Sequence, residues 1–99
     1  MSTGQNAGSI PELSEIRKAI DGIDGALITL FAKRFAEVNK VVKVKQKHDL
    51  PAAIPARIEE IVLKIRADAT KQGFPPDVAE KIWRLLINEM IIFEESHLT

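Results

Sequence analysis

The segment IRKAIDGIDGALITLFAKRFAEVNKVVKVKQK, residues 16–47, decides the fold that this sequence predicts. Apolar residues recur through its first half with alternating spacings of four and three, which places them on one face of a helix. They are Ile16, Ile20, Ile23, Leu27 and Leu30. The same rhythm continues to Arg34, Val38, Val41 and Lys45. Because buried cations need a partner, two cations on a packing face predict an anionic ligand or an acidic side chain beside them.

We expect one helix from about residue 11 to about residue 48. Gly22 and Gly25 lie in its middle, where each costs about 1 kcal/mol relative to alanine, and a turn is the alternative. The apolar stripe keeps its phase through both glycines, which favours a continuous helix. Pro51 ends the helix, because the residue before a proline avoids helical geometry.

The start of the chain predicts a disordered tail, residues 1–10, before a helical domain at residues 11–99. The tail is short, polar and bears glycine. Pro11 suits the first turn of a helix, and Ser9 or Ser14 is the expected N-terminal cap.

Two shorter helices follow the long one. The first is expected at residues 57–71, with Gly73 as a left-handed cap. The second is expected at residues 78–97, with Asp77 as its cap. No alternating strand pattern is present, so the fold class is all-α, with three helices per chain.

The long helix predicts a second chain. About 35 residues span about 50 Å at 1.5 Å per residue, whereas a compact chain of this size is only about 33 Å across. An apolar stripe on a helix of that length needs a covering partner. We therefore expect an intertwined homodimer.

Composition narrows the function classes. The 99 residues include 14 basic and 14 acidic side chains, so no net charge favours nucleic acid or a membrane surface as partner. There is no cysteine, and the two histidines, His48 and His97, are expected to be solvated helix-end residues, so no metal site is predicted. No leader or long apolar run is present, which makes a cytoplasmic location the expectation.

Residues 33–47 carry six cations against one acid, Glu37. A solvated basic face, a phosphate-binding surface and pairing with internal acids such as Glu89 or Glu94 are alternative interpretations. Arg34 and Lys45 stand apart because eleven residues is close to three turns, so both project in nearly one direction, about 16 Å apart. Side chains converging from both ends would hold a small anion.

Arg17 lies 17 residues before Arg34, about 25 Å away along the axis and about 100° round the helix. It cannot share a small ligand with Arg34 of its own chain. In a dimer it could reach the equivalent site of the other chain.

A pattern of linked spacings runs through these residues. Arg34 lies 17 residues after Arg17, and Lys45 lies 11 after Arg34. The pattern opens with Ile16-Arg17-Lys18-Ala19-Ile20-Asp21-Gly22-Ile23-Asp24 and continues through Ile54-Pro55-Ala56-Arg57 to Glu94. Over residues 12–97 it resembles the all-helical chorismate mutase family.

The resemblance implies a dimer with two pockets, each formed by both chains, and a pericyclic reaction without cofactor or metal. It implies that Arg17 of one chain and Arg34 of the other bind the two carboxylates of the substrate. Lys45 would bind a carboxylate and the ether oxygen of the breaking bond. Arg57 would line the pocket, and Glu94 takes the position of the second ether-oxygen donor. The apolar wall implied by the resemblance consists of Val41, Ile61, Ile87, Met90 and Ile91.

Physical chemistry agrees with this set of residues. A pericyclic rearrangement needs only a dicarboxylate held in its reactive conformer and positive charge where the ether oxygen becomes negative. Arginine binds carboxylates bidentately, and lysine supplies a mobile point charge. An ionised Glu94 cannot donate to an ether oxygen, so we expect it to act protonated, with activity that falls as the pH rises.

The predicted activity is that of a chorismate mutase. Ile58 stands where many mutases carry an acid, and together with Ala53-Ile54-Pro55-Ala56 it resembles the isochorismate pyruvate lyase branch. Conversion of isochorismate to salicylate and pyruvate is therefore the alternative reaction. A non-catalytic helical dimer that binds nucleic acid or an acidic partner is the alternative from another class.

Overall fold

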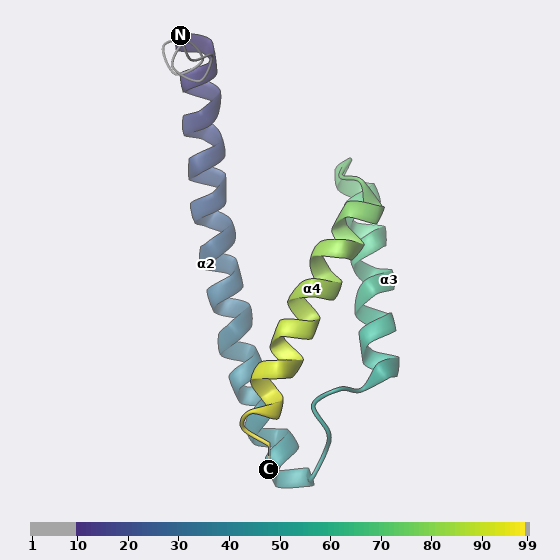
Figure 1. Cartoon of the computed structure of the whole chain (residues 1–99). Coiled ribbons are helices and arrows are strands. Elements are labelled where there is room, and N and C mark those ends of the chain that lie inside the picture. The colour runs from purple at the N-terminus through teal and green to yellow at the C-terminus, as the bar shows by residue number, and fades with distance from the viewer. Residues whose placement is uncertain (1–9, 99) are drawn as a thin grey trace, which may run out of the picture. The chain divides into compact units, whose positions relative to one another are not determined.

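The computed structural model describes residues 10–98. Its elements are three helices, α2 (Pro11–His48), α3 (Pro55–Gln72) and α4 (Pro76–Glu95) (Figure 1). Residues 10–98 contain no strand. The prediction of an all-α chain with one long helix and two shorter ones is confirmed. The predicted tail lies outside the described residues except for Ile10.

Helix α2 runs through both glycines without interruption, as predicted. A Cβ added at Gly22 or Gly25 would meet nothing within 4 Å, so neither glycine is required by a close contact within the described chain. Ser14 lies inside the first turn, where its N–H donates to the carbonyl of Ile10 at 3.0 Å. Ser14 is therefore not the cap, and Ser9 falls outside the described residues.

The C-terminal end of α2 is a Schellman turn. Asp49 has a φ of 55°, and its N–H donates to the carbonyl of Gln46 at 3.4 Å. The N–H of Leu50 donates to the carbonyl of Lys45 at 2.9 Å. The turn reverses the chain directly after the helix and returns it toward Lys45.

Helix α3 ends in the same kind of turn, but with glycine at the left-handed position. Gly73 has a φ of 73°, as its predicted role as cap requires. Its N–H donates to the carbonyl of Thr70 at 3.2 Å, and the N–H of Phe74 donates to that of Ala69 at 2.9 Å. The next helix therefore starts after a short turn.

Helix α4 differs from its prediction at both ends. It begins at Pro76 and ends at Glu95, whereas residues 78–97 were expected. Its N-cap is Pro75 and makes no side-chain cap bond. Asp77 lies within the first turn, so the prediction of Asp77 as the cap was wrong. A proline at the first helical position starts the helix there because its fixed φ is already helical.

Helices α3 and α4 pack side by side as an antiparallel pair (Figure 1). Among residues 10–98, six apolar side chains are buried, and three of them are alanines. They are Val42, Ala52, Val62, Ala69, Ala79 and Ile87. No described side chain is less than 2% exposed. The hydrocarbon core of the isolated chain is therefore thin.

The chain divides into two compact units, with the boundary between Ala36 and Glu37. The described part of the first unit contains the N-terminal portion of α2, and its apolar stripe is 45% to 60% exposed. The second unit contains the end of α2 together with α3 and α4. No helix among the described residues is long and apolar enough to cross a membrane.

Candidate functional site

A largely buried ion pair joins the ends of two helices in the second unit. Lys45 lies in the last turn of α2, and Glu94 lies in the last turn of α4. Lys45 Nζ is 2.7 Å from Glu94 Oε1, and the two side chains are 12% and 9% exposed. Burial of two charges is costly unless their geometry and hydrogen bonds compensate for lost water. The Lys45–Glu94 pair is therefore a candidate for a functional role.

The connection between α2 and α3 holds the lysine from another side. Lys45 Nζ also donates to the carbonyl of Ala52 at 2.7 Å, and Ala52 is buried. Two acceptors therefore fix the ammonium, one from a side chain and one from the backbone. This arrangement limits the freedom of a side chain that otherwise has four rotatable bonds.

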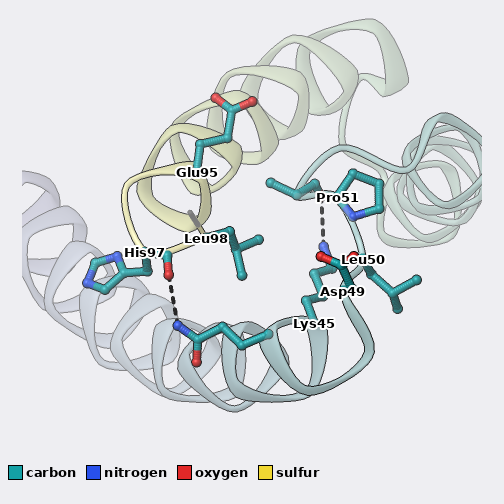
Figure 2. A pocket seen from close by; sticks show the side chains of 9 residues that line it. Lys45, Asp49, Leu50, Pro51, Glu95, His97 and Leu98 are labelled. Carbon is teal, nitrogen blue, oxygen red and sulfur yellow. Dashed lines mark hydrogen bonds between the residues drawn. The ribbon is translucent and has the colours of Figure 1, made fainter.

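A cavity of about 530 Å³ opens beside Lys45 (Figure 2). Its walls combine charged, polar and apolar side chains from the end of α2, the following connection, the last residue of α4 and the segment after it. They are Lys45, Gln46, Asp49, Leu50, Pro51, Ala52, Glu95, His97 and Leu98. Lys45 is the one predicted site residue that lines it. The cavity is therefore not the hydrocarbon-walled pocket expected from the sequence.

The predicted apolar wall falls on all three helices of the second unit. Ile87 is buried, and Ile61, Met90 and Ile91 are half-buried. Val41 is 41% exposed. Four of the five residues are thus at least partly covered within one chain, and their assignment to a substrate wall stays a prediction.

The three predicted arginines lie in different surroundings. Arg57, in the first turn of α3, is exposed and forms an ion pair with Glu60 on the same helix. Arg17 is exposed and Arg34 is half-buried, and both belong to the first unit. Their joint action on one ligand stays a prediction.

The alternative interpretation, in which Lys45 pairs with an internal acid, matches the contact with Glu94 in this structure. Glu89, the other acid considered, is exposed. His48 and His97 are both exposed near helix ends, as expected. Glu94 therefore supplies the carboxyl group beside the ammonium of the lysine.

A second set of ion pairs, not expected from the sequence, links α3 to α4. Arg66 Nη1 is 2.9 Å from both Asp77 and Glu80. Arg84 lies 2.9 Å from Glu59 and 2.7 Å from Glu80. The spacing of four between Glu80 and Arg84 was the available signal. The rest depends on which turns of the two helices face each other.

These ion pairs shift several pKa values. Hydrogen bonds from Arg84 lower the pKa of Glu59 and that of Glu80 below their ordinary value. The same carboxylates raise the pKa of Arg84, and Asp77 together with Glu80 raises the pKa of Arg66. These two glutamates and two arginines are therefore charged near neutral pH.

Comparison with known proteins covers most of the chain. Residues 16–95 match the family model described as chorismate mutase type II. The T-protein of Enterobacter agglomerans is 36% identical over 87 residues, which cover 88% of this chain and 23% of that protein. The bifunctional chorismate mutase/prephenate dehydratase of Aquifex aeolicus is 30% identical over 88 residues, covering 86% of this chain and 24% of that protein.

A relative of similar length is also found. The chorismate mutase of Methanocaldococcus jannaschii is 29% identical over 89 residues, which cover 90% of each chain. The T-proteins of Enterobacter agglomerans and Haemophilus influenzae are much longer, and the chain spans 23% and 20% of their respective lengths.

Proposed function

Because this chain belongs to the chorismate mutase type II family, we propose that it converts chorismate to prephenate. The observation that carries the proposal is the ammonium of Lys45, which is largely buried and held by two acceptors at 2.7 Å. A fixed positive charge in a poorly solvated place stabilises negative charge that develops on an ether oxygen. No nucleophile is needed for such a rearrangement.

Binding of the dicarboxylate is assigned to the arginines. We propose that Arg34 and Arg57 act with Arg17 of a second chain, and that the reactive conformer of the substrate is held by these charges. A planar guanidinium binds a carboxylate through two parallel hydrogen bonds, which fixes orientation as well as position. Correct orientation supplies much of the acceleration in a reaction of this type.

Exposed apolar side chains on two helices support the proposed homodimer. The apolar stripe of α2 is exposed in the isolated chain, and α4 carries a second one. The residues of the α4 stripe, between 41% and 64% exposed, are Val78, Ile82, Leu85 and Ile92. Exposed apolar faces of this extent are typical of protein interfaces. Their coverage by a second copy is consistent with the thin core of a single chain.

Glu94 is proposed to act in its protonated form. Protonated, it donates a hydrogen bond to the ether oxygen and frees Lys45 from its ion pair. Ionised, it neutralises Lys45 and repels an anionic substrate. The reaction should therefore slow as the pH rises.

Cleavage of isochorismate to salicylate and pyruvate is the second candidate. Ile58, next to Arg57 on α3, is half-buried and offers no carboxylate to a ring hydroxyl. The relatives described above include proteins named chorismate mutase, which favours the mutase reaction. A cytoplasmic location stays a prediction from the sequence.

The two reactions are separable with the purified chain. Loss of the ultraviolet absorbance of chorismate measures the mutase reaction, and salicylate fluorescence with isochorismate measures the lyase reaction. Faster turnover of chorismate supports the proposal, and faster release of salicylate replaces it with the lyase. Salt-sensitive binding to DNA without turnover of either substrate would instead support the non-catalytic dimer.

A further inference from the structure

One side-chain hydrogen bond ties the segment after α4 to α2. Gln46 Nε2 donates to the carbonyl of His97 at 2.8 Å, and Figure 2 shows this bond as a dashed line ending at His97. Gln46 directly follows Lys45 in α2. His97 lies three residues after Glu94, and its N–H donates to the Glu94 carbonyl at 3.0 Å. The tie therefore connects the two backbone turns that carry the ion pair.

Other bonds in this segment shape it without placing it against α2. Ser96 Oγ donates to the carbonyl of Phe93 at 2.6 Å, and the Ser96 N–H donates to that of Ile92 at 3.1 Å. The imidazole of His97 lies against the ring of Phe93, with 4.5 Å between the ring centres. All of these contacts are local to the end of α4. The bond from Gln46 is a contact of a different kind because it reaches α2.

We propose that Gln46 is a positioning residue for the Lys45–Glu94 pair. The role in catalysis rests on the proposed function, since it matters only if this pair acts on the substrate. Gln46 sets the distance between the last turns of α2 and α4, and thereby the distance between the ammonium and the carboxyl group. A displacement of about 1 Å in a catalytic group costs up to about a hundredfold in rate. Loss of one exposed tie should have a smaller effect than that.

The decisive variant is Gln46→Glu. It keeps the size of the side chain but replaces the donating NH2 by an oxygen, which repels the His97 carbonyl. We expect kcat to fall about five- to tenfold with KM within about twofold of wild type, because misplacement affects the chemical step more than binding. Gln46→Lys keeps a donor and should recover more than half of the lost kcat.

Lys47→Gln is the matched control. It makes the same change of one charge unit at the next residue, whose side chain is exposed. It should leave kcat and KM unchanged. If Lys47→Gln lowers kcat as much as Gln46→Glu does, the effect is one of net charge and the proposal is wrong.

Amide hydrogen exchange tests the tie without activity. In Gln46→Glu, the amides of His97 and Leu98 should exchange at least about threefold faster than in wild type, and in Lys47→Gln they should not. Unchanged exchange, or faster exchange with unchanged kcat, overturns the positioning role. A wild-type chain that turns over neither chorismate nor isochorismate overturns the proposed function instead, and the exchange rates alone then decide whether the tie exists.

Discussion

The second unit contains two kinds of ion pair, and they differ in burial. The Lys45–Glu94 pair has side chains 12% and 9% exposed, whereas the side chains of the α3–α4 network range from 28% to 84% exposed. The network joins two helices that already pack against each other. The buried pair lies instead at helix ends, beside a cavity. Burial therefore distinguishes the Lys45–Glu94 pair, which we propose to act on the substrate, from the exposed pairs that link α3 to α4.

Exposure to water determines how much each kind of ion pair contributes to the stability of the fold. An exposed pair gains little because water solvates its charges almost equally well when they are apart. A buried pair gains little as a whole, but removal of one partner leaves an unpaired charge and costs about 3–5 kcal/mol. Single substitutions should therefore distinguish the two kinds sharply.

The largest effect is expected from Lys45→Ala. It removes the positive charge proposed to face the ether oxygen, and kcat/KM for chorismate should fall about 10²–10³-fold. Lys43→Ala is the matched control, since Lys43 lies two residues earlier on the same helix and is exposed. It should retain wild-type activity. Equal losses in the two variants would place the catalytic charge elsewhere.

Glu94→Ala should weaken folding much more than the loss of an acid from an exposed pair. Among the described residues it leaves the largely buried Lys45 with the Ala52 carbonyl as acceptor, and the free energy of unfolding should drop by about 3 kcal/mol. Urea denaturation followed by circular dichroism measures this drop. Glu60→Ala, which breaks an exposed pair with Arg57, should cost less than about 1 kcal/mol. A cost for Glu94→Ala as small as that for Glu60→Ala would contradict the contrast drawn between the two kinds of pair.

The dependence of kcat on pH tests the role of Glu94. If its protonated form donates the hydrogen bond, kcat should fall as the pH rises. Glu94→Gln carries a permanent donor and should give a flat profile over the same range. A wild-type rate independent of pH would exclude a protonated Glu94.

The smallest effect is expected on stability when acid weakens the exposed ion pairs between α3 and α4. Because Arg84 lowers the pKa of Glu59 and Glu80, the folded chain binds protons on them less readily than the unfolded chain. Their contribution is therefore present above the ordinary pKa of 4.5 and is lost as the pH falls through the lower folded value. Glu59→Gln should lower the urea midpoint slightly at neutral pH, and this difference should vanish in acid.

Exposed Glu89 provides the comparison for that experiment. Glu89→Gln should leave the urea midpoint close to wild type at every pH, since Glu89 is on the same helix as Arg84 and is exposed. If the Glu59→Gln difference persists in acid, the lowered pKa values do not report a stabilising network.

The sequence predicted helices better than contacts. The stripe from Ile16 to Leu30 carried α2 correctly through Gly22 and Gly25, because helical periodicity is a local property. The cap of α4 was missed since Asp77 resembles a capping residue, while Pro76 starts the helix first. Capping residues and prolines compete at helix starts, and local pattern alone does not rank them.

The site was predictable where it follows the heptad rhythm. Lys45 was singled out because a cation continued an apolar face, and Glu94 was one of two acids named for it. The Ala52 carbonyl and the Gln46 tie were not foreseen, because they depend on the path of the connecting segment and on the end of α4. The grouping of Arg17 with Arg34 stays a prediction, since it involves a second chain.

The use of a backbone carbonyl to hold Lys45 has a consequence for how this protein can vary over evolution. Every amino acid supplies a backbone carbonyl at position 52, so the residues between Asp49 and Pro55 can be substituted without removing the acceptor. An insertion or deletion in that segment would move the oxygen away from the ammonium. Among homologues that keep the lysine, the length of this connection should therefore vary less than its amino-acid sequence.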